Sequence, residues 1–311
     1  MTEHVTTAPV DRIPSRRLPR KRGSRKARLT AFAFIAPAAI AYAAFVLVPL
    51  AMSFYYSLLR WDGIGEARFH GLTNYFTVLT DPKLLQIIGN AFQLVAYFTV
   101  IPVLLGLAVA SAIRGHMAGK FGTVTRTVLF LPQVIPLVAA GIAWSWMFAS
   151  TGVVNQMLKS IGLSSWVRGW LGDFVWALPA VGIIGAWVLL GLCTMLLVTG
   201  ITKIDPSLYE AARLDGARPW HEFRYITLPG LRQEIGVCVT LTVISALASF
   251  DIVYISTQGG PGITTTVPGL EIYRLAFAHR QVGIASALAI VLMVLVLISI
   301  APVQWLTRDK K

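Results

Sequence analysis

Long charge-free stretches constrain this chain more than any other feature of its sequence. Five of them contain no Asp, Glu, Lys or Arg, and a sixth, Ile235–Leu270, contains a single charged residue, Asp251. The five are Ala31–Leu59, Ala91–Ile113, Thr127–Met157, Phe174–Thr202 and Gln281–Thr307. A transmembrane helix needs about 20 consecutive apolar residues, so each stretch is long enough to cross a bilayer.

This pattern predicts an all-α, polytopic membrane protein with six transmembrane helices. The helices are expected at residues 31–58, 90–113, 127–149, 175–200, 235–257 and 283–304. The composition agrees, because 56% of the residues are hydrophobic and 13% are charged, whereas soluble domains carry about 25% charged residues. Pro132 and Pro136 in the third helix and Pro179 in the fourth indicate kinks or close helix contacts.

The cysteines and histidines of the chain do not indicate a disulfide or a metal site. Cys193 and Cys238 both fall inside predicted helices, and the five histidines are scattered along the chain. Small buried cysteines are the simplest interpretation, and the histidines lack the spacing of metal ligands.

Basic residues are distributed unequally between the two sides of the predicted helices. The net charge is +13, and most Lys and Arg residues precede the first helix or lie in loops on the same side of it. The opposite side holds only Arg60, Arg68, Lys83, Lys159, Arg168, Arg274 and Arg280. Cytoplasmic loops carry the excess of positive charge, so both termini and the loop of residues 201–234 are predicted to be cytoplasmic.

Three segments are expected along the chain. Residues 1–29 form a basic cytoplasmic arm, which its like charges keep disordered; residues 30–305 form the membrane domain, and residues 306–311 a short cytoplasmic tail. The arm is interpreted as an orientation signal that contacts anionic lipid, not as a nucleic-acid-binding segment. The first apolar run is longer than the ~7–15-residue core of a cleaved signal peptide, which predicts an uncleaved anchor.

The cytoplasmic loop between the fourth and fifth helices has the signals of a capped helical hairpin. Asp205 can accept hydrogen bonds from free backbone amides, and Pro206 fits the first position of a helix. Gly216 can adopt the left-handed conformation that ends a helix. Pro219 can start a second helix, and Pro229 limits it before the next transmembrane segment.

Small side chains on this hairpin favour contact with another protein. Ala211 and Ala212 allow a second surface to approach the helix backbone closely, and Glu210, Arg213 and Asp215 place charges around that contact. A helix that lies on lipid would need a larger apolar face, so the pattern is typical of insertion into a groove of a protein partner.

The segment EAARLDGARPWHEFRYITLP resembles the cytoplasmic signature of ABC-importer permeases. That signature is Glu-Ala-Ala, three residues, Gly, nine residues and Ile-x-Leu-Pro, and this chain matches every position of it. The segments FDIVYISTQGGPG, Phe250–Gly262, and FHGLTNYFTVL, Phe69–Leu79, are similar to the carbohydrate, maltose-type branch of the same family. The resemblance covers about residues 30 to 305.

The resemblance implies that the chain is half of the translocation pore of an ATP-driven sugar importer in the inner membrane. The 205–229 hairpin would dock into a cleft of a separate ATPase. The implied interface residues are Tyr209, Glu210, Ala211, Ala212, Asp215, Gly216, Ile226, Leu228 and Pro229. The implied partners are a second permease subunit, an ATPase dimer and an extracytoplasmic solute-binding protein.

No enzymatic signature accompanies these features. A phosphate-binding loop requires G-x-x-x-x-G-K-[ST], and the glycine-rich segment Gln258–Thr266 contains no lysine. The chain is therefore not expected to be an enzyme or to bind a cofactor, and ATP and Mg belong on the partner ATPase.

Substrate contacts are expected where polar groups and aromatic rings meet at membrane depth. Asp251, the one acidic residue near the fifth helix, is the first candidate, although a structural role in pairing or capping stays equally open. The other candidates are Tyr254, Phe250, Trp144 and Gln133, with Trp146 and Asn155 as weaker ones.

Two other functions stay open at this point. A stand-alone secondary transporter would need ionisable residues inside the membrane for ion coupling, and Asp251 is the only one available. An ABC permease for a polyol or for glycerol phosphate would share the same hairpin, because the pore residues do not identify the solute.

The predicted topology can be tested with single cysteines introduced at residues 66, 218 and 262. We expect a membrane-impermeant maleimide to label positions 66 and 262 from outside intact cells, because these loops lie on the side that is poor in basic residues. Position 218 should react only after the membrane is opened. Labelling of position 218 in intact cells would mean that the chain has the opposite orientation in the membrane.

Overall fold

The computed structural model describes residues 25–114 and 119–307. It divides into two compact units, residues 1–51 and 52–311. The predicted arm lies outside the described residues except for its last five, which belong to α1 (Arg25–Tyr42). Residues 308–311 of the predicted tail are also outside the described part.

The first unit is a helical run with an apolar surface. It contains α1, the π-helical η1 (Ala43–Leu47) and the start of α2 (Val48–Ser57). Residues 32–57 are long and apolar enough to cross a membrane, and Phe34 and Phe45 are 81% and 82% exposed. A helix with apolar side chains on all faces requires lipid or protein around it.

The second unit is almost entirely helical. A two-stranded ribbon pairs β1 (Leu59–Arg60) with β2 (Arg68–Phe69) in antiparallel register, Leu59 opposite Phe69. The helices that follow the ribbon are α3 (Thr73–Thr80), α4 (Pro82–Ile113), α5 (Lys120–Val134), α6 (Leu137–Met147) and α7 (Val153–Ser160). The short 3-10 turns η3 (Ser164–Trp166) and η4 (Trp170–Gly172) follow, and then α8 (Ala177–Ile201).

The remaining elements form the hairpin and the last third of the bundle. The hairpin contains α9 (Pro206–Leu214), α10 (Pro219–Glu222), η5 (Phe223–Thr227) and α11 (Leu228–Gly230). The elements after it are α12 (Arg232–Leu247), α13 (Asp251–Ser256), α14 (Pro268–Tyr273), η6 (Arg274–Ala278) and α15 (Val282–Thr307).

The prediction of an all-α membrane protein is confirmed. Four helical segments of the described chain are each long and apolar enough to cross a membrane, and two bent pairs bring the number to six if each pair counts as one span. The bent pairs are residues 127–134 with 137–147, and residues 219–230 with 232–247.

The third predicted helix is broken at its second proline. Ile135, which precedes Pro136, has ψ of 128° instead of a helical value, because the proline ring disfavours helical backbone in the residue before it. The two halves, α5 and α6, meet at 104°.

The fifth predicted helix is also broken, and here the continuous helix expected over 235–257 is wrong. α12 ends at Leu247, Phe250 has φ −141° and ψ −59°, and a new helix starts at Asp251. A tertiary contact accompanies the break. Gly269 of α14 packs so closely on the break that a Cβ there would lie 2.8 Å from the Ser249 carbonyl oxygen.

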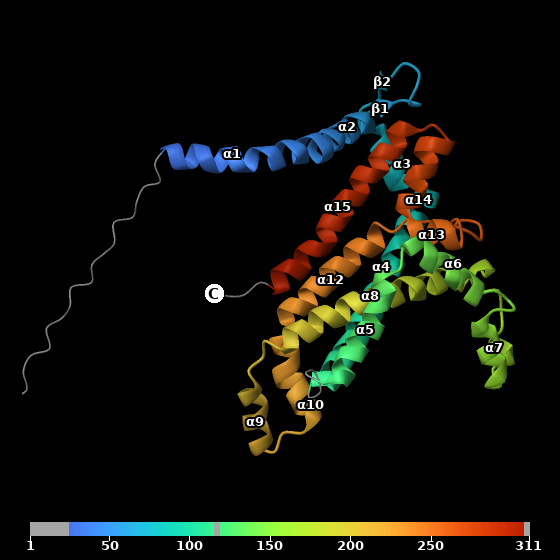
Figure 1. Cartoon of the computed structure of the whole chain (residues 1–311). Helices are drawn as coiled ribbons and strands as arrows, with labels where there is room; N and C mark the ends of the chain where they lie inside the picture. The colour runs from blue at the N-terminus through green and yellow to red at the C-terminus, as the bar shows by residue number, and fades with distance from the viewer. Residues whose placement is uncertain (1–24, 115–118, 308–311) are drawn as a thin grey trace, which may run out of the picture. The chain divides into compact units, whose positions relative to one another are not determined.

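The bundle is held by close packing of α4 on α8 (Figure 1). A Cβ added to Gly182 would lie 2.5 Å from the Tyr97 ring, and one added to Gly185 would lie 2.0 Å from the Phe98 ring. Glycine thus makes the space that the aromatic rings of α4 fill. Close packing of this kind replaces the hydrophobic effect, which is weak between helices in lipid.

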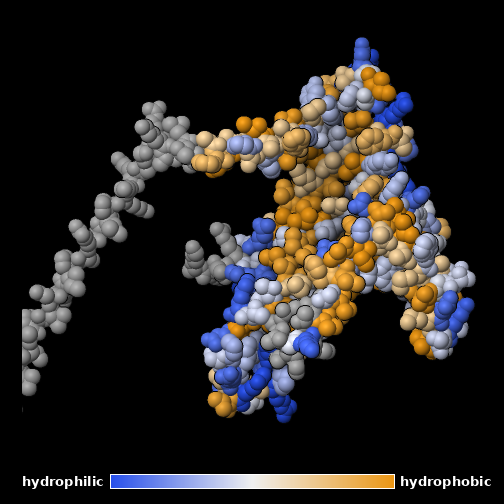
Figure 2. Space-filling model, in the orientation of Figure 1, coloured by the Kyte–Doolittle hydropathy of each residue, from blue (hydrophilic) through white to orange (hydrophobic). Residues whose placement is uncertain are grey.

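The surface of the second unit is divided by polarity. On the face that Figure 2 shows, hydrophobic residues cover much of α8, α12 and α15, whereas hydrophilic residues gather over α9 and α10 and near the β-ribbon. This is the distribution expected of a bundle whose middle lies in lipid and whose ends reach water.

A pair of glycine substitutions tests the packing of α4 on α8. Gly185→Ala should destabilise the purified protein by roughly 1–3 kcal/mol, because the methyl group overlaps the Phe98 ring. Gly89→Ala is the matched control, because nothing lies within 4 Å of its added Cβ, and it should stabilise α4 by about 0.5–1 kcal/mol. Thermal unfolding in detergent measures both, and equal shifts would contradict the packing.

Candidate functional site

The first half of the hairpin is capped at both ends as its sequence predicts. The Asp205 carboxylate accepts a hydrogen bond from the Ser207 amide at 2.9 Å, and this amide together with the Ser207 hydroxyl lowers the pKa of Asp205. Gly216 has φ +80°, and the Ala217 amide donates to the Ala212 carbonyl at 2.9 Å. Only glycine adopts such a φ without strain, which is why the helix ends there.

Tyr209 joins the two halves of the hairpin from inside. Its side chain is buried, and its hydroxyl group lies 3.0 Å from the hydroxyl of Thr227 on η5. The prediction placed Tyr209 on the docking surface. The structure instead places its side chain between the helices, where it sets their separation.

A buried carboxylate ties the hairpin to the end of α4. Glu222 is 5% exposed; its oxygens accept hydrogen bonds from Arg213 of α9 at 2.8 Å and from Arg114, directly after α4, at 2.6 Å. The Arg114 guanidinium also lies 3.7 Å from the centre of the Tyr209 ring. The hydrogen bonds from Arg213 and Arg114 hold the pKa of Glu222 below its usual range.

Neither Glu222 nor Arg114 is among the residues predicted from the sequence. Glu222 falls in the nine positions that the permease signature leaves unspecified, and its partner Arg114 is 108 residues away along the chain. No sequence pattern relates two residues so far apart, so the sequence alone could not predict this ion pair.

The predicted interface residues differ in their exposure. Glu210, Ala211, Asp215, Gly216 and Pro229 are exposed, whereas Ala212, Ile226 and Leu228 are half-buried. Large apolar side chains that were not predicted also reach the hairpin surface, above all Leu214, which is 90% exposed. The other exposed ones are Leu208, Trp220 and Tyr225.

A cavity of about 570 Å³ lies where the two broken helices meet. One wall is the α5–α6 break, residues 133–137, and another is the α12–α13 break, residues 248–252. Phe98 of α4 and Gly185 of α8 complete it together with neighbouring apolar residues. Its volume is in the range of small-molecule sites.

Three of the five predicted substrate residues come together in this cavity. Gln133, Phe250 and Asp251 all line it, and the Gln133 Oε1 atom is buried without a hydrogen-bond partner in the described structure. Tyr254 stacks on Phe250 with ring centroids 5.3 Å apart. The cavity therefore brings together three groups: the unpaired amide oxygen of Gln133, the exposed carboxylate of Asp251 and the aromatic ring of Phe250.

Trp144, the fifth candidate, does not line the cavity. It packs in a hydrophobic cluster, with its ring 5.6 Å from Trp187 and 5.1 Å from Phe148. Of the two weaker candidates, Trp146 is exposed on α6, and Asn155 is fully buried away from the cavity.

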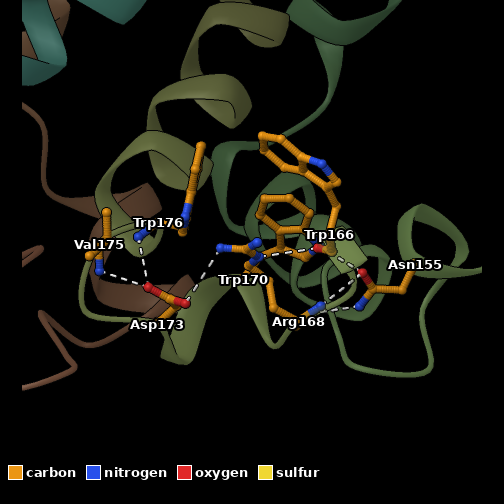
Figure 3. Close-up of polar contacts among 7 residues, drawn as sticks. All are labelled: Asn155, Trp166, Arg168, Trp170, Asp173, Val175 and Trp176. Carbon is orange, nitrogen blue, oxygen red and sulfur yellow. Dashed lines mark hydrogen bonds and ion pairs between the residues drawn. The ribbon is translucent and has the colours of Figure 1, made fainter. Parts of the chain in front are cut away.

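Asn155 instead organises the loop before α8 (Figure 3). Its amide group donates to the carbonyls of Ala149, at 3.0 Å, and Arg168, at 2.7 Å, and its oxygen accepts from the Trp170 indole at 2.9 Å. All of its hydrogen-bonding capacity is used within the loop, so Asn155 is a structural residue.

The same loop carries a cluster of three tryptophans around one arginine. The Arg168 guanidinium lies 5.2–5.7 Å from the ring centres of Trp166, Trp170 and Trp176 and 4.0 Å from Asp173 (Figure 3). Two backbone amides at the start of α8 hold the Asp173 carboxylate and lower its pKa. The three tryptophans thus pack around a charged centre.

Comparisons with known proteins agree with this architecture. The family described as "binding-protein-dependent transport system inner membrane component" matches residues 103–311. The probable ABC transporter permease YurN of Bacillus subtilis is 34% identical, over 87% of this chain and 93% of that protein. The trehalose/maltose permease MalF of Thermococcus litoralis is also 34% identical, over 88% and 91% of the two chains.

Two further relatives extend the comparison. The diacetylchitobiose uptake permease NgcF of Streptomyces coelicolor is 30% identical over 93% of this chain and 86% of that one. A chain from the crystal structure of a bacterial alginate ABC transporter, in complex with an alginate pentasaccharide-bound periplasmic protein, superimposes with a TM-score of 0.75. It is 25% identical and covers 91% of this chain and 95% of that chain.

The family match covers well over half of the chain, and relatives at least 30% identical match most of it. The chain therefore belongs to the binding-protein-dependent transport system inner membrane component family and is a permease subunit of an ABC transporter.

Proposed function

We propose that the chain forms half of the translocation pore of an ATP-driven sugar importer and couples to a separate ATPase through the 205–229 hairpin. The observation that carries the proposal is the attachment of a rigid, exposed hairpin to the helices that line the cavity. The named substrates of the relatives support a sugar, because they include trehalose/maltose, lactose and diacetylchitobiose.

The exposed face of α9 is suited to a groove on the ATPase. Leu208, Ala211 and Leu214 follow each other at intervals of three residues, so they lie on one side of the helix. Glu210 and Asp215 are exposed beside them. An apolar centre with a charged rim is the usual form of a protein interface.

Movement of the hairpin has two routes to the cavity. Arg114 joins Glu222 to the end of α4, and α4 carries Phe98 into the cavity wall. The second half of the hairpin continues through a bend of 68° into α12, whose Ile244 and Ser245 also line the cavity. Closure of an ATPase dimer on ATP would therefore change the shape of the cavity through rigid helices, which is the requirement for alternating access.

The chemistry of the cavity favours a neutral, hydroxyl-rich solute. Gln133 and Asp251 can hydrogen-bond hydroxyl groups, and the Phe250 ring can pack on the C–H face of a sugar. No Lys or Arg is among the described residues that line it, whereas a phosphate ester would require a cation nearby. Among the alternatives, this disfavours glycerol phosphate more than a polyol.

The other subunits follow from the chemistry that this chain lacks. ATP and Mg would bind to the partner ATPase, since the sequence contains no phosphate-binding loop. A second permease subunit would complete the pore, and an extracytoplasmic binding protein would deliver the sugar. The complex between the alginate transporter and its periplasmic protein supports this last partner.

Leu214 offers a direct test of docking because its side chain makes almost no contact within the chain. Leu214→Glu should leave insertion unchanged but weaken binding of the ATPase roughly tenfold or more, because it places a charge at the centre of an apolar contact. Leu214→Met is the matched control and should behave as wild type. If Leu214→Glu retained normal ATPase co-purification and transport, α9 would not be part of the interface with the ATPase.

Glu222→Gln tests whether the ion cluster transmits movement. Loss of the charge should destabilise the hairpin by on the order of 2 kcal/mol and lower the sugar transported per ATP hydrolysed, while the ATPase stays bound. Glu66→Gln, an exposed carboxylate outside the hairpin, is the control and should change little. Unaltered coupling in Glu222→Gln would mean that Arg114 and Glu222 only hold the hairpin in place.

The effect of Glu222 should depend on pH in a defined direction. Because its pKa is lowered in the folded protein, its stabilisation is complete above the unfolded-state pKa and is lost as the pH falls through the folded-state pKa. The stability of wild type and Glu222→Gln, measured by thermal unfolding, should therefore converge in acid. A constant difference down to strongly acidic pH would contradict this origin.

A further inference from the structure

A groove lined mainly by polar residues lies at the end of the second unit opposite the hairpin (Figure 1). Its walls are the β1–β2 ribbon with its connecting loop, α3 and the start of α15, and its volume is about 700 Å³. We call it the ribbon groove. α15 begins here and ends beside the hairpin, where Thr307 packs on Gly236 of α12. The ribbon groove shares no lining residue with the cavity of the candidate site.

Two contacts fix the ribbon on the helices around it. The Asn74 side-chain amide of α3 donates to the carbonyls of Ser57, at 2.8 Å, and Leu59, at 2.9 Å. Gly283 of α15 approaches the ribbon so closely that a Cβ there would lie 2.0 Å from the Leu59 carbonyl oxygen. Because the walls of the groove are fixed in advance, a ligand would bind with little loss of conformational freedom.

Arginines gather in the ribbon groove although its side of the chain is poor in basic residues. Arg60, Arg68 and Arg280 line the groove, and they are three of the seven basic residues predicted on that side. Positive charge is disfavoured there by the positive-inside tendency. Three arginines in one groove on this side therefore indicate a local role.

Two of these arginines have no acidic partner. Arg68 lies 3.9 Å from Glu66, whereas Arg60 and Arg280 are exposed and take part in no ion pair among the described residues. Most of the other basic residues on this side are used within the chain: Lys83 binds Glu271, Arg168 binds Asp173, and Arg274 donates to the Gln258 carbonyl.

Asp62, the other carboxylate of the ribbon groove, is held by its own turn. It accepts hydrogen bonds from the amides of Ile64, at 3.0 Å, and Gly65, at 2.7 Å. These two amides are the main reason that the pKa of Asp62 lies below its usual range, and the charge of Arg280 adds to the effect. The guanidinium groups of Arg60 and Arg280 thus stay available for an external anion, and guanidinium groups match the geometry of phosphate oxygens.

The backbone of Arg280 has a conformation that side chains rarely adopt. Its φ is +52°, in the left-handed region where glycine is the usual residue at the end of a helix. Residues in such conformations are found preferentially at functional sites. An arginine at a position that favours glycine therefore indicates that its guanidinium group has a role in the ribbon groove.

The ribbon groove lies at the level of lipid headgroups. The apolar spans of residues 32–57 and 282–307 both end at it, so Arg60 and Arg280 lie within three residues of an apolar span. Ile64 and Phe69, on the ribbon and its connecting loop, are each 76% exposed, and Trp61 lines the groove. Cationic groups beside exposed apolar side chains at a membrane surface are suited to an amphipathic anion.

We propose that the ribbon groove binds the headgroup of an anionic phospholipid such as phosphatidylglycerol. Arg60 and Arg280 would bind the phosphate, and Trp61, Ile64 and Phe69 would contact the glycerol backbone and the upper part of the acyl chains. Inorganic phosphate shares the anionic chemistry but cannot use the apolar side chains. In the orientation predicted from the basic residues, this lipid belongs to the leaflet outside the cytoplasm.

The test measures lipid binding to the purified transporter, together with its accompanying subunits, by native mass spectrometry in detergent. The probes are dihexanoyl phosphatidylglycerol and dihexanoyl phosphatidylcholine, which has the same phosphate but no net charge, with inorganic phosphate as a competitor. The variants are Arg60→Gln, Arg280→Gln and Arg280→Gly. Lys159→Gln, which removes an exposed cation of α7 outside the ribbon groove, is the matched control.

We expect wild type to bind phosphatidylglycerol more tightly than phosphatidylcholine, and each glutamine variant to weaken phosphatidylglycerol binding about fivefold. Lys159→Gln should bind as wild type does, and inorganic phosphate at the lipid concentration should displace no lipid. Arg280→Gly should also bind less lipid, yet unfold at the same or a higher temperature, because glycine adopts the left-handed backbone without strain. This variant separates loss of the guanidinium group from loss of structure.

Other results would overturn the inference and leave the proposed function intact. Equal phosphatidylglycerol binding by wild type and by the Arg60→Gln, Arg280→Gln double variant would mean that the ribbon groove is not a lipid site. Displacement of the lipid by an equal concentration of inorganic phosphate would make it a site for small anions. If the variants lost the extracytoplasmic binding protein but kept phosphatidylglycerol, the groove would be a protein contact. A lower unfolding temperature of Arg280→Gly would make Arg280 a structural residue.

Discussion

The contact of the α4 aromatic rings with the α8 glycines is the constraint on which the functional parts of the second unit depend. In lipid, helices gain little from burying apolar surface against one another, so association requires close complementary packing. Gly185 provides it by admitting the Phe98 ring, and both residues then form part of the cavity wall. The packing that holds the bundle together therefore also shapes its candidate binding site.

Helix α4 connects the two ends of the bundle through this contact. At one end, Lys83 pairs with Glu271 of α14, and the Asn90 amide donates to the carbonyls of Ile263, at 3.0 Å, and Thr266, at 2.8 Å. At the other end, Arg114 pairs with Glu222 of the hairpin. A single helix thus contacts the loop after α13, the cavity and the hairpin, so it links the hairpin to the proposed sugar site.

The sequence was most informative where a residue type by itself determines the local backbone conformation. Asp205, Pro206 and Gly216 predict the capped helix because capping, fixed φ and positive φ are local properties. The break before Pro136 has the same origin. The break at Phe250 could not be predicted, because no proline marks it and the glycine that packs on it, Gly269, comes from another helix.

The sequence by itself determined the class of protein and the signature of the hairpin, since hydrophobic length and local backbone preference are properties of neighbouring residues. Only the tertiary structure decided which polar and aromatic residues share a site. It brought Gln133 to Phe250 and Asp251, excluded Trp144 and Asn155, and paired Arg114 with Glu222. Such contacts join residues far apart along the chain, and helix packing alone sets their distances.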